Sequence, residues 1–145
     1  MAATPPAAAR YAVPLALGEA GRSIVLDALE GARFESVGPL AGNEYRELGI
    51  GAASGGLIGI RHLRATRPFD ASTGWHWHDM DVHAVYVLRG SITYRFRGHE
   101  GEVVVNAGGC LTQPAGVPHD VVAHTDDLEL LEITSPQRFG TFEPA

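Results

Sequence analysis

The stretch GWHWHDMDVHAVYVLRG, residues 74–90, contains the pattern that decides how this chain folds. Residues two apart on a β-strand point to the same face of a sheet, so His76 and His78 are expected to be neighbouring imidazoles on one side. His83 follows five residues later, and Gly90 ends the stretch. Two imidazoles on one face are the arrangement that two ligands of a single metal ion require. The stretch therefore predicts a metal site built on a strand.

A second stretch, GGCLTQPAGVPH at residues 108–119, ends in another histidine, His119. Its glycines and prolines predict turns between short strands. Histidines concentrated in two short stretches are not expected of an ordinary surface. The two stretches together predict a bound transition metal, but they say much less about what that metal does.

Composition limits the class of protein. The chain has 145 residues, which is the usual size of one domain. Its net charge is −6, so it has no excess of cations for nucleic-acid phosphates, and no apolar run is long enough for a membrane span. The single cysteine, Cys110, excludes an intramolecular disulfide and suits a reducing compartment. We therefore expect a cytoplasmic protein with neither nucleic-acid nor membrane partners.

Glycine and proline divide the chain into short apolar segments. Residues 1–20 are rich in alanine and proline and are predicted to form a flexible N-terminal arm, and residues 21–145 a single domain. Residues 23–29 are compatible with either a strand or a short helix. The predicted strands are 32–37, 43–50, 56–65, 75–78, 83–89, 91–97, 101–105, 109–113, 118–124 and 128–134. About ten short strands with frequent turns favour an all-β sandwich or jelly-roll barrel.

Both histidine stretches resemble the paired motifs of the cupins, which are small jelly-roll barrels (double-stranded β-helices) with a metal in the barrel mouth. The first cupin motif is Gly-x5-His-x-His-x3–4-Glu-x6-Gly, and the second is Gly-x5-Pro-x-Gly-x2-His-x3-Asn. The positions that match are His76, His78, Gly90, Gly108, Pro114, Gly116 and His119. The resemblance covers roughly residues 56–134. It implies an all-β jelly-roll fold and, from the family alone, a homodimer.

The chain departs from the cupin pattern at three positions. His83 stands at the glutamate position, Ala123 at the asparagine position, and only one residue, instead of five, separates Gly74 from His76. The resemblance therefore implies a four-histidine site, His76, His78, His83 and His119, that holds one first-row transition metal ion per subunit. Fe(II) is favoured, and Mn, Zn, Ni or Cu also suit imidazole ligands. Alternatively, His83 donates a hydrogen bond near the metal instead of ligating it.

The expected pocket is mostly apolar, because strand parity turns Val85, Val87, Val121 and Ala123 towards the barrel interior. Such a pocket suits a compact organic substrate. The favoured function is a metal-dependent dioxygenase acting on a small dicarbonyl or aromatic compound, in a site without a carboxylate at the fourth position. Two alternatives remain open: a non-oxidative Lewis-acid isomerase, cyclase or lyase, and a cupin that binds a small ligand without turnover.

Overall fold

The structure is a computed structural model that describes residues 11–14, 23–36 and 40–145. Strands dominate this part of the chain, and its one helix, α1, has four residues. No helix within it is long and apolar enough to cross a membrane. The elements are β1 (Tyr11–Pro14), β2 (Ser23–Leu26), β3 (Asn43–Glu47), α1 (Ile50–Ala53), β4 (Gly59–Ala65), β5 (Trp77–His78), β6 (Val82–Arg89), β7 (Ser91–Phe96), β8 (Glu102–Asn106), β9 (Cys110–Gln113), β10 (His119–His124), β11 (Glu129–Ser135) and β12 (Thr141–Phe142).

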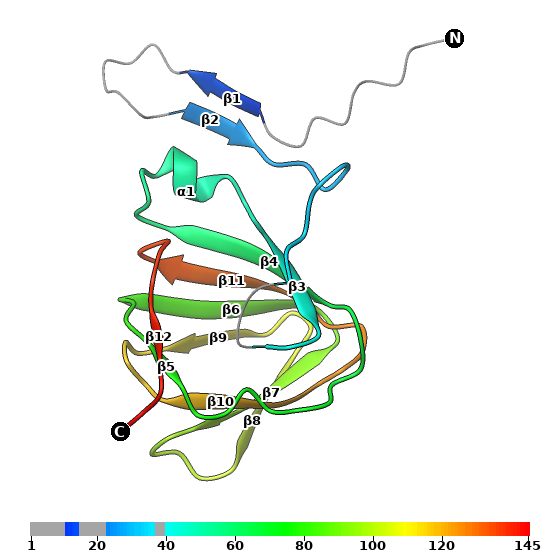
Figure 1. The fold of residues 1–145 in the computed structure, drawn as a ribbon, viewed down its shortest axis with the longest axis vertical. Coiled ribbons are helices and arrows are strands. Elements are labelled where there is room, and N and C mark those ends of the chain that lie inside the picture. Colours follow the sequence, from blue (N-terminus) through cyan, green and yellow to red (C-terminus); the bar gives the residue numbers. More distant parts are fainter. Residues whose placement is uncertain (1–10, 15–22, 37–39) are drawn as a thin grey trace.

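The strands form a jelly-roll barrel, as predicted from the motifs (Figure 1). Its larger sheet has the order β3-β4-β11-β6-β9, and the smaller one has the order β10-β7-β8. A two-stranded pair, β12-β5, lies along one side, while the β1-β2 hairpin lies beyond α1 at one end of the molecule. Every pair of strands is antiparallel.

The hydrophobic core joins the two larger sheets. Alternation along β6 and β7 turns every second side chain inward, so apolar residues of both sheets meet inside the barrel. The fully packed cluster consists of Val85, Val87, Ile92, Tyr94, Val105, Val121, Leu128 and Leu130. Several of these residues also line the cavity described below, so the core forms its floor.

The β6–β7 hairpin depends on Gly90. This residue has φ of +70°, a conformation that side chains with a Cβ rarely adopt. A Cβ placed there would lie 2.1 Å from Thr125 Oγ1 and 2.6 Å from Asp127 Oδ1. The motif glycine is therefore required by both the turn and the close approach of the neighbouring loop.

The structure differs from the predicted strands mainly before residue 59. In the predicted strand 32–37, the described residues 32–36 contribute only an isolated bridge between Glu35 and Tyr45, and residue 37 lies outside the described residues. The predicted strand 43–50 ends at Glu47, because the chain turns into α1. The ambiguous segment 23–29 contains the strand β2, which pairs with β1 inside the predicted N-terminal arm. The remainder of that arm lies outside the described residues.

Candidate metal centre

The backbone brings the two histidine motifs together directly. His76, just before β5, forms an isolated antiparallel bridge with His119, the first residue of β10. Each donates its N–H to the carbonyl of the other, at N···O distances of 2.9 and 2.8 Å. The bridge fixes the two side chains as neighbours, and β5 places His78 two residues further along the same face.

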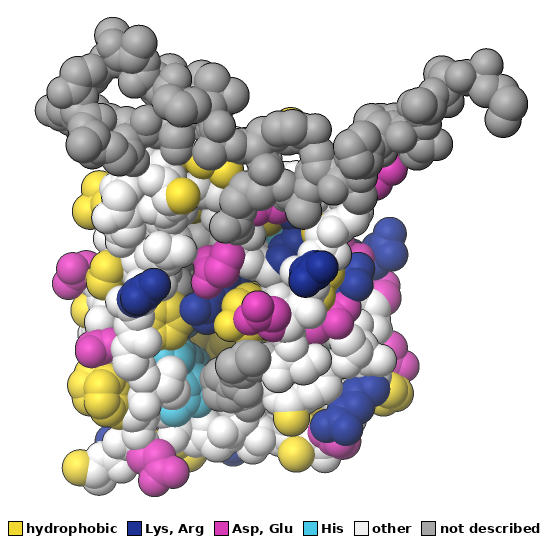
Figure 2. All heavy atoms as spheres, turned by 45° about the horizontal axis from the view of Figure 1, so that its top comes forward, with side chains coloured by type: hydrophobic (Ala, Val, Ile, Leu, Met, Phe, Trp, Pro, Cys, Tyr) yellow, Lys and Arg dark blue, Asp and Glu magenta, His cyan; other side chains and the backbone are white. Residues whose placement is uncertain are grey.

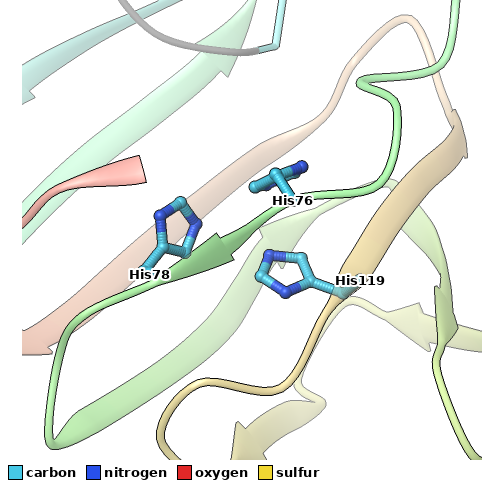
Figure 3. A group of neighbouring side chains, drawn as sticks. All are labelled: His76, His78 and His119. Atoms are coloured by element: carbon cyan, nitrogen blue, oxygen red, sulfur yellow. The ribbon is translucent and has the colours of Figure 1, made fainter. Parts of the chain in front are cut away.

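His76, His78 and His119 form a compact buried cluster (Figure 3). One ring nitrogen from each lies within 4.8 Å of the corresponding nitrogens of the other two. Their ring centroids are 4.4 Å apart for His76 and His119, and 5.0 Å apart for His76 and His78. The structure thus gathers three of the four predicted ligands around one point.

Backbone carbonyls hold two of these rings. His76 Nδ1 donates to the carbonyl of Gly74 at 2.8 Å, and His119 Nδ1 donates to the carbonyl of Val117 at 2.9 Å. A proton on Nδ1 leaves Nε2 with the lone pair that a metal requires. Both rings are therefore fixed in orientation and in the tautomer that ligates through Nε2.

A side chain holds the third ring. Thr141 on β12 faces His78 across the β5–β12 pair, and its Oγ1 lies 2.9 Å from His78 Nδ1. The threonine hydroxyl accepts from Nδ1 when Nε2 serves as the ligand. The sequence analysis did not identify Thr141, because its role depends on pairing between strands 63 residues apart.

Burial favours the neutral form of two of these imidazoles, those of His78 and His119. Desolvation lowers the pKa of His78 to about 4, assisted by the charge of neighbouring His83. Desolvation also lowers the pKa of His119 to about 3, although its hydrogen bond to Val117 acts in the opposite direction. Neutral imidazoles are the form that binds metal. Three oriented imidazole nitrogen donors fit a first-row transition metal ion.

His83 lies beside the cluster but is not a member of it within the described residues. Its ring centroid is 5.3 Å from that of His78. Its Nδ1 forms a short contact with the amide nitrogen of Gln113, and its Nε2 lies 3.2 Å from Glu132 Oε2. Both ring nitrogens therefore have protein partners, as in the alternative in which His83 hydrogen-bonds near the metal. Direct ligation by His83 stays a prediction.

Glu132 on β11 brings a carboxylate to the cavity beside the cluster. Its side chain is 22% exposed, and Oε2 faces His83 Nε2. Burial alone would raise the pKa of Glu132, but the hydrogen bond from His83 and the charges of His83, Arg61 and His78 hold it below its usual range. Sequence analysis considered only the motif positions and so did not identify Glu132, which strand pairing supplies from outside both motifs.

A cavity of about 250 Å³ opens from the histidine cluster. Figure 2 shows histidine surface at a hollow in one face of the molecule, with basic and acidic side chains nearby. The floor is apolar and includes Val85 and Val121 as predicted, but Val87 belongs to the core. Ala123 is not among the lining residues, since the register of β10 shifts between Val121 and Ala123.

The cavity lining is mostly apolar, as predicted, but the wall formed by β3, β4 and β11 also carries polar and charged groups. Arg61 and Glu132 face the cavity from neighbouring strands, with Tyr45 and Asn43 from β3 beside them. These charges are tolerated at the wall because they lie close to ions of opposite sign: Arg61 is 2.7 Å from Glu47 and 3.9 Å from Glu132.

Comparison with known proteins agrees with this architecture. Residues 65–134 match the family described as cupin domain, and no curated protein sequence matches the chain significantly. Among solved structures, KdgF from Halomonas sp. is 19% identical with a TM-score of 0.61, over 77% of this chain and 94% of that one. The polyketide cyclase RemF from Streptomyces resistomycificus is 20% identical with a TM-score of 0.63, over 78% of this chain and 80% of that one.

A third solved structure is considerably longer than this chain. Oxalate decarboxylase from Bacillus subtilis is 23% identical with a TM-score of 0.57, over 70% of this chain but only 28% of that protein. At such identities these likenesses show a shared fold and leave the activity open. Since the matched segment contains both histidine motifs, and the strands form the barrel that those motifs imply, residues 65–134 belong to a cupin domain and the chain has the cupin fold.

Proposed function

We propose that this cupin is a metal-dependent enzyme that moves a proton within a small, oxygen-bearing organic substrate, which is the non-oxidative Lewis-acid class of activity. The observation that carries the proposal is the carboxylate of Glu132, hydrogen-bonded to His83 and lining the same cavity as the three-histidine cluster. A metal site and a positioned carboxylate base are the two parts that such proton transfer needs.

His76, His78 and His119 would hold one first-row divalent ion through Nε2. When bound, the ion would polarise a carbonyl or hydroxyl oxygen of the substrate and acidify the adjacent C–H bond. The apolar floor, including Val85 and Val121, would receive the hydrocarbon part of the substrate and exclude water from it.

Glu132 would accept the proton. Its Oε2 is occupied by the hydrogen bond to His83, so Oε1, which lies on the Arg61 side, is the acceptor atom. The C–H bond breaks, its electron pair stays on the substrate, and Oε1 returns the proton at another carbon. No oxidant or reductant is consumed. His83 would act by orienting this carboxylate and keeping it ionised.

The dioxygenase remains a second candidate. The cluster offers three imidazoles and no carboxylate ligand among the described residues, which leaves the full charge of a divalent ion uncompensated. That charge favours a chelating dicarbonyl or aromatic diol bound as an anion, and Fe(II) would be the preferred ion. The Lewis-acid activity is placed first because the dioxygenase gives Glu132 no role.

The two candidates are separated by metal exchange and oxygen uptake. The chain is loaded with Zn²⁺ or, without air, with Fe²⁺, and incubated in D₂O with a panel of small 1,3-dicarbonyl, 2-hydroxyketone and catechol compounds. Proton transfer predicts deuterium incorporation by NMR with Zn²⁺, retained without oxygen and lost in Glu132→Gln, which keeps its metal. Oxygen uptake with Fe²⁺ alone, without exchange, would support the dioxygenase. Tight retention of a compound without turnover would indicate a non-catalytic binding protein.

We further propose that the protein is a cytoplasmic homodimer. Its only other binding partner in this proposal is the small-molecule substrate. Cys110 is an exposed free thiol, which suits a reducing compartment. Val82, Tyr86 and Leu88 alternate on the outward face of β6 and are 39–45% exposed, an apolar row that a second copy would cover. Light scattering should give twice the chain mass of 15.4 kDa. Tyr86→Glu should give the monomer, whereas Val104→Glu on the exposed surface of β8 should not.

A further inference from the structure

Arg61 is a charged group of the cavity for which proton transfer has no direct use. It lies on β4, beside Glu132 of the adjacent strand β11, and its side chain is 27% exposed. Inward parity along β4 places it on the same face as Leu63, and both residues line the cavity. An arginine held at the wall of a small cavity is a common means of recognising a carboxylate.

The guanidinium of Arg61 is held in a fixed position. Its Nε donates to Glu47 Oε1 at 2.7 Å, and its Cζ lies 4.7 Å from the ring centroid of Tyr45 and 5.0 Å from that of Phe139. Contact with two aromatic rings and one carboxylate fixes the plane of the group. A side chain ordered in this way loses little further entropy when it binds a ligand.

The terminal nitrogens of Arg61 retain hydrogen-bonding capacity. Within the described part of the chain, Nε is the guanidinium atom with a hydrogen bond, and Nη1 lies 3.9 Å from Glu132 Oε1, beyond hydrogen-bonding distance. Arg64 provides a contrast on the same strand. It pairs with Glu44 and stacks on Phe34, and it is not among the residues lining the cavity.

Arg61 and the histidine cluster lie on either side of Glu132. One carboxylate oxygen of Glu132 faces Arg61 and the other faces His83, whose ring neighbours His78. A single small molecule in the cavity can therefore reach both the cluster and the guanidinium. Without a metal the carboxylates of Glu47 and Glu132 outnumber the cation, and a bound divalent ion would reverse that balance and attract an anion.

We propose that Arg61 binds a carboxylate of the substrate, so that the enzyme acts on a small oxo- or hydroxy-carboxylic acid. The opposite end of the molecule places an oxygen donor at His76, His78 and His119. The inference rests on the proposed function, because it assigns the substrate class of the same site. An oxo- or hydroxy-carboxylic acid differs from a neutral ketone by its carboxylate, and that carboxylate is the group that would contact Arg61.

The test measures binding by calorimetry with a metal-directed probe series. Each probe carries a hydroxamate, which binds Zn²⁺, and one to three methylenes that end in a carboxylate or in the matching neutral amide. For the Zn²⁺-loaded wild type, the best carboxylate should bind at least about tenfold more tightly than its amide, as expected for a charge-assisted hydrogen bond. Arg61→Gln should remove this preference while leaving metal content and amide affinity unchanged.

Two further variants complete the experiment. Arg61→Lys keeps the charge but loses the planar fork, so it should retain only part of the preference. Arg64→Gln, the matched control on the same strand, should retain all of it. An equal affinity of the wild type for carboxylate and amide, or an undiminished preference in folded Arg61→Gln, would overturn the proposal. If the amide probes do not bind the Zn²⁺-treated wild type, the chain has no metal site of the proposed kind. Both proposals would then be wrong.

Discussion

At the position where the cupin motif has a glutamate, this chain has His83, and a glutamate reaches the same region from another strand as Glu132. The two residues contact each other at 3.2 Å. The carboxylate is thereby placed next to the metal ligands without belonging to the cluster, where it is available as a base. Under the proposed function, this difference from the motif leaves a carboxylate available to accept a proton instead of ligating the metal.

The residue-scale prediction that follows concerns metal content. Wild type should bind about one Zn²⁺ or Fe²⁺ per chain, and His78→Ala or His119→Ala should reduce this to near zero, because two imidazoles do not define a stable site. His83→Ala should retain at least half of the metal, since both of its ring nitrogens contact other side chains. Elemental analysis after dialysis gives the values. Equal loss in all three variants would make His83 a ligand.

Thr141 allows a second prediction at the same scale. Thr141→Val keeps the shape of the side chain but removes the oxygen that accepts from His78 Nδ1. Loss of such an orienting partner weakens metal binding by about 10- to 100-fold in comparable sites. Competition with a chromophoric chelator measures the affinity. Thr112→Val on the exposed side of β9 is the control, and equal affinities of the two variants would contradict an orienting role for Thr141.

Residue identity and spacing could predict His76, His78 and His119, because those positions are fixed by local motif and strand parity. Glu132, Arg61 and Thr141 could not be predicted in this way. In the segment 128–134, apolar residues occupy both parities, so the alternation does not show whether Glu132 points inward. Its direction is settled only by the register of β11 against β4 and β6.

At the scale of elements, the turn glycines provide a matched pair of sites. Gly90 and Gly98 both have positive φ, +70° and +86°, but a Cβ meets Thr125 and Asp127 only at Gly90. Gly98→Ala should therefore reduce the free energy of unfolding by about 1 kcal/mol, the cost of the left-handed conformation. Gly90→Ala should reduce it by about 2 kcal/mol more, because the Thr125 loop must also move. Urea denaturation measures both, and equal losses would exclude the steric contribution.

Strand prediction succeeded from β4 to β11, where alternation is regular and glycines mark the turns. It was less successful before β4 for a physical reason. Residues 32–37 have strand-like composition, but among the described residues 32–36 only Glu35 forms a β-bridge, with Tyr45. Composition alone does not show whether a segment at the edge of a sheet has a neighbouring strand to pair with along its length. Likewise, the α1 turn follows β3 directly and shortens a segment that the pattern assigned entirely to a strand.

At the scale of the whole molecule, the interior of the barrel has two parts, a packed core and a cavity. Val87, Ile92 and Leu128 are at most 1% exposed and belong to the packed core. The remaining interior contains the histidine cluster and the cavity. His78 and His119 are 6% and 2% exposed, so the folded chain holds their imidazoles where a positive charge is poorly solvated. The fold therefore couples its own stability to the protonation of the metal site.

This coupling predicts the acid stability of the metal-free protein. The folded state has lowered pKa values of about 4 for His78 and about 3 for His119, whereas the unfolded chain has the ordinary value of 6.5. Between these values the unfolded state binds more protons, so the free energy of unfolding falls as the pH falls. From about pH 6 to about pH 5 the two histidines should together cost roughly 2 kcal/mol. The lowered pKa of Glu132 adds a loss of the same sign below its usual value of 4.5.

Urea denaturation of the chelator-treated chain at several pH values measures this dependence. Replacing both histidines, as His78→Gln with His119→Gln, removes the two titrating groups, so the free energy of unfolding should then change much less between about pH 6 and about pH 5. The comparison of slopes does not depend on the absolute stability of the variant. A wild-type slope no steeper than that of the double variant would mean that the folded chain accepts the protons, and that burial does not hold these imidazoles in the ligating form.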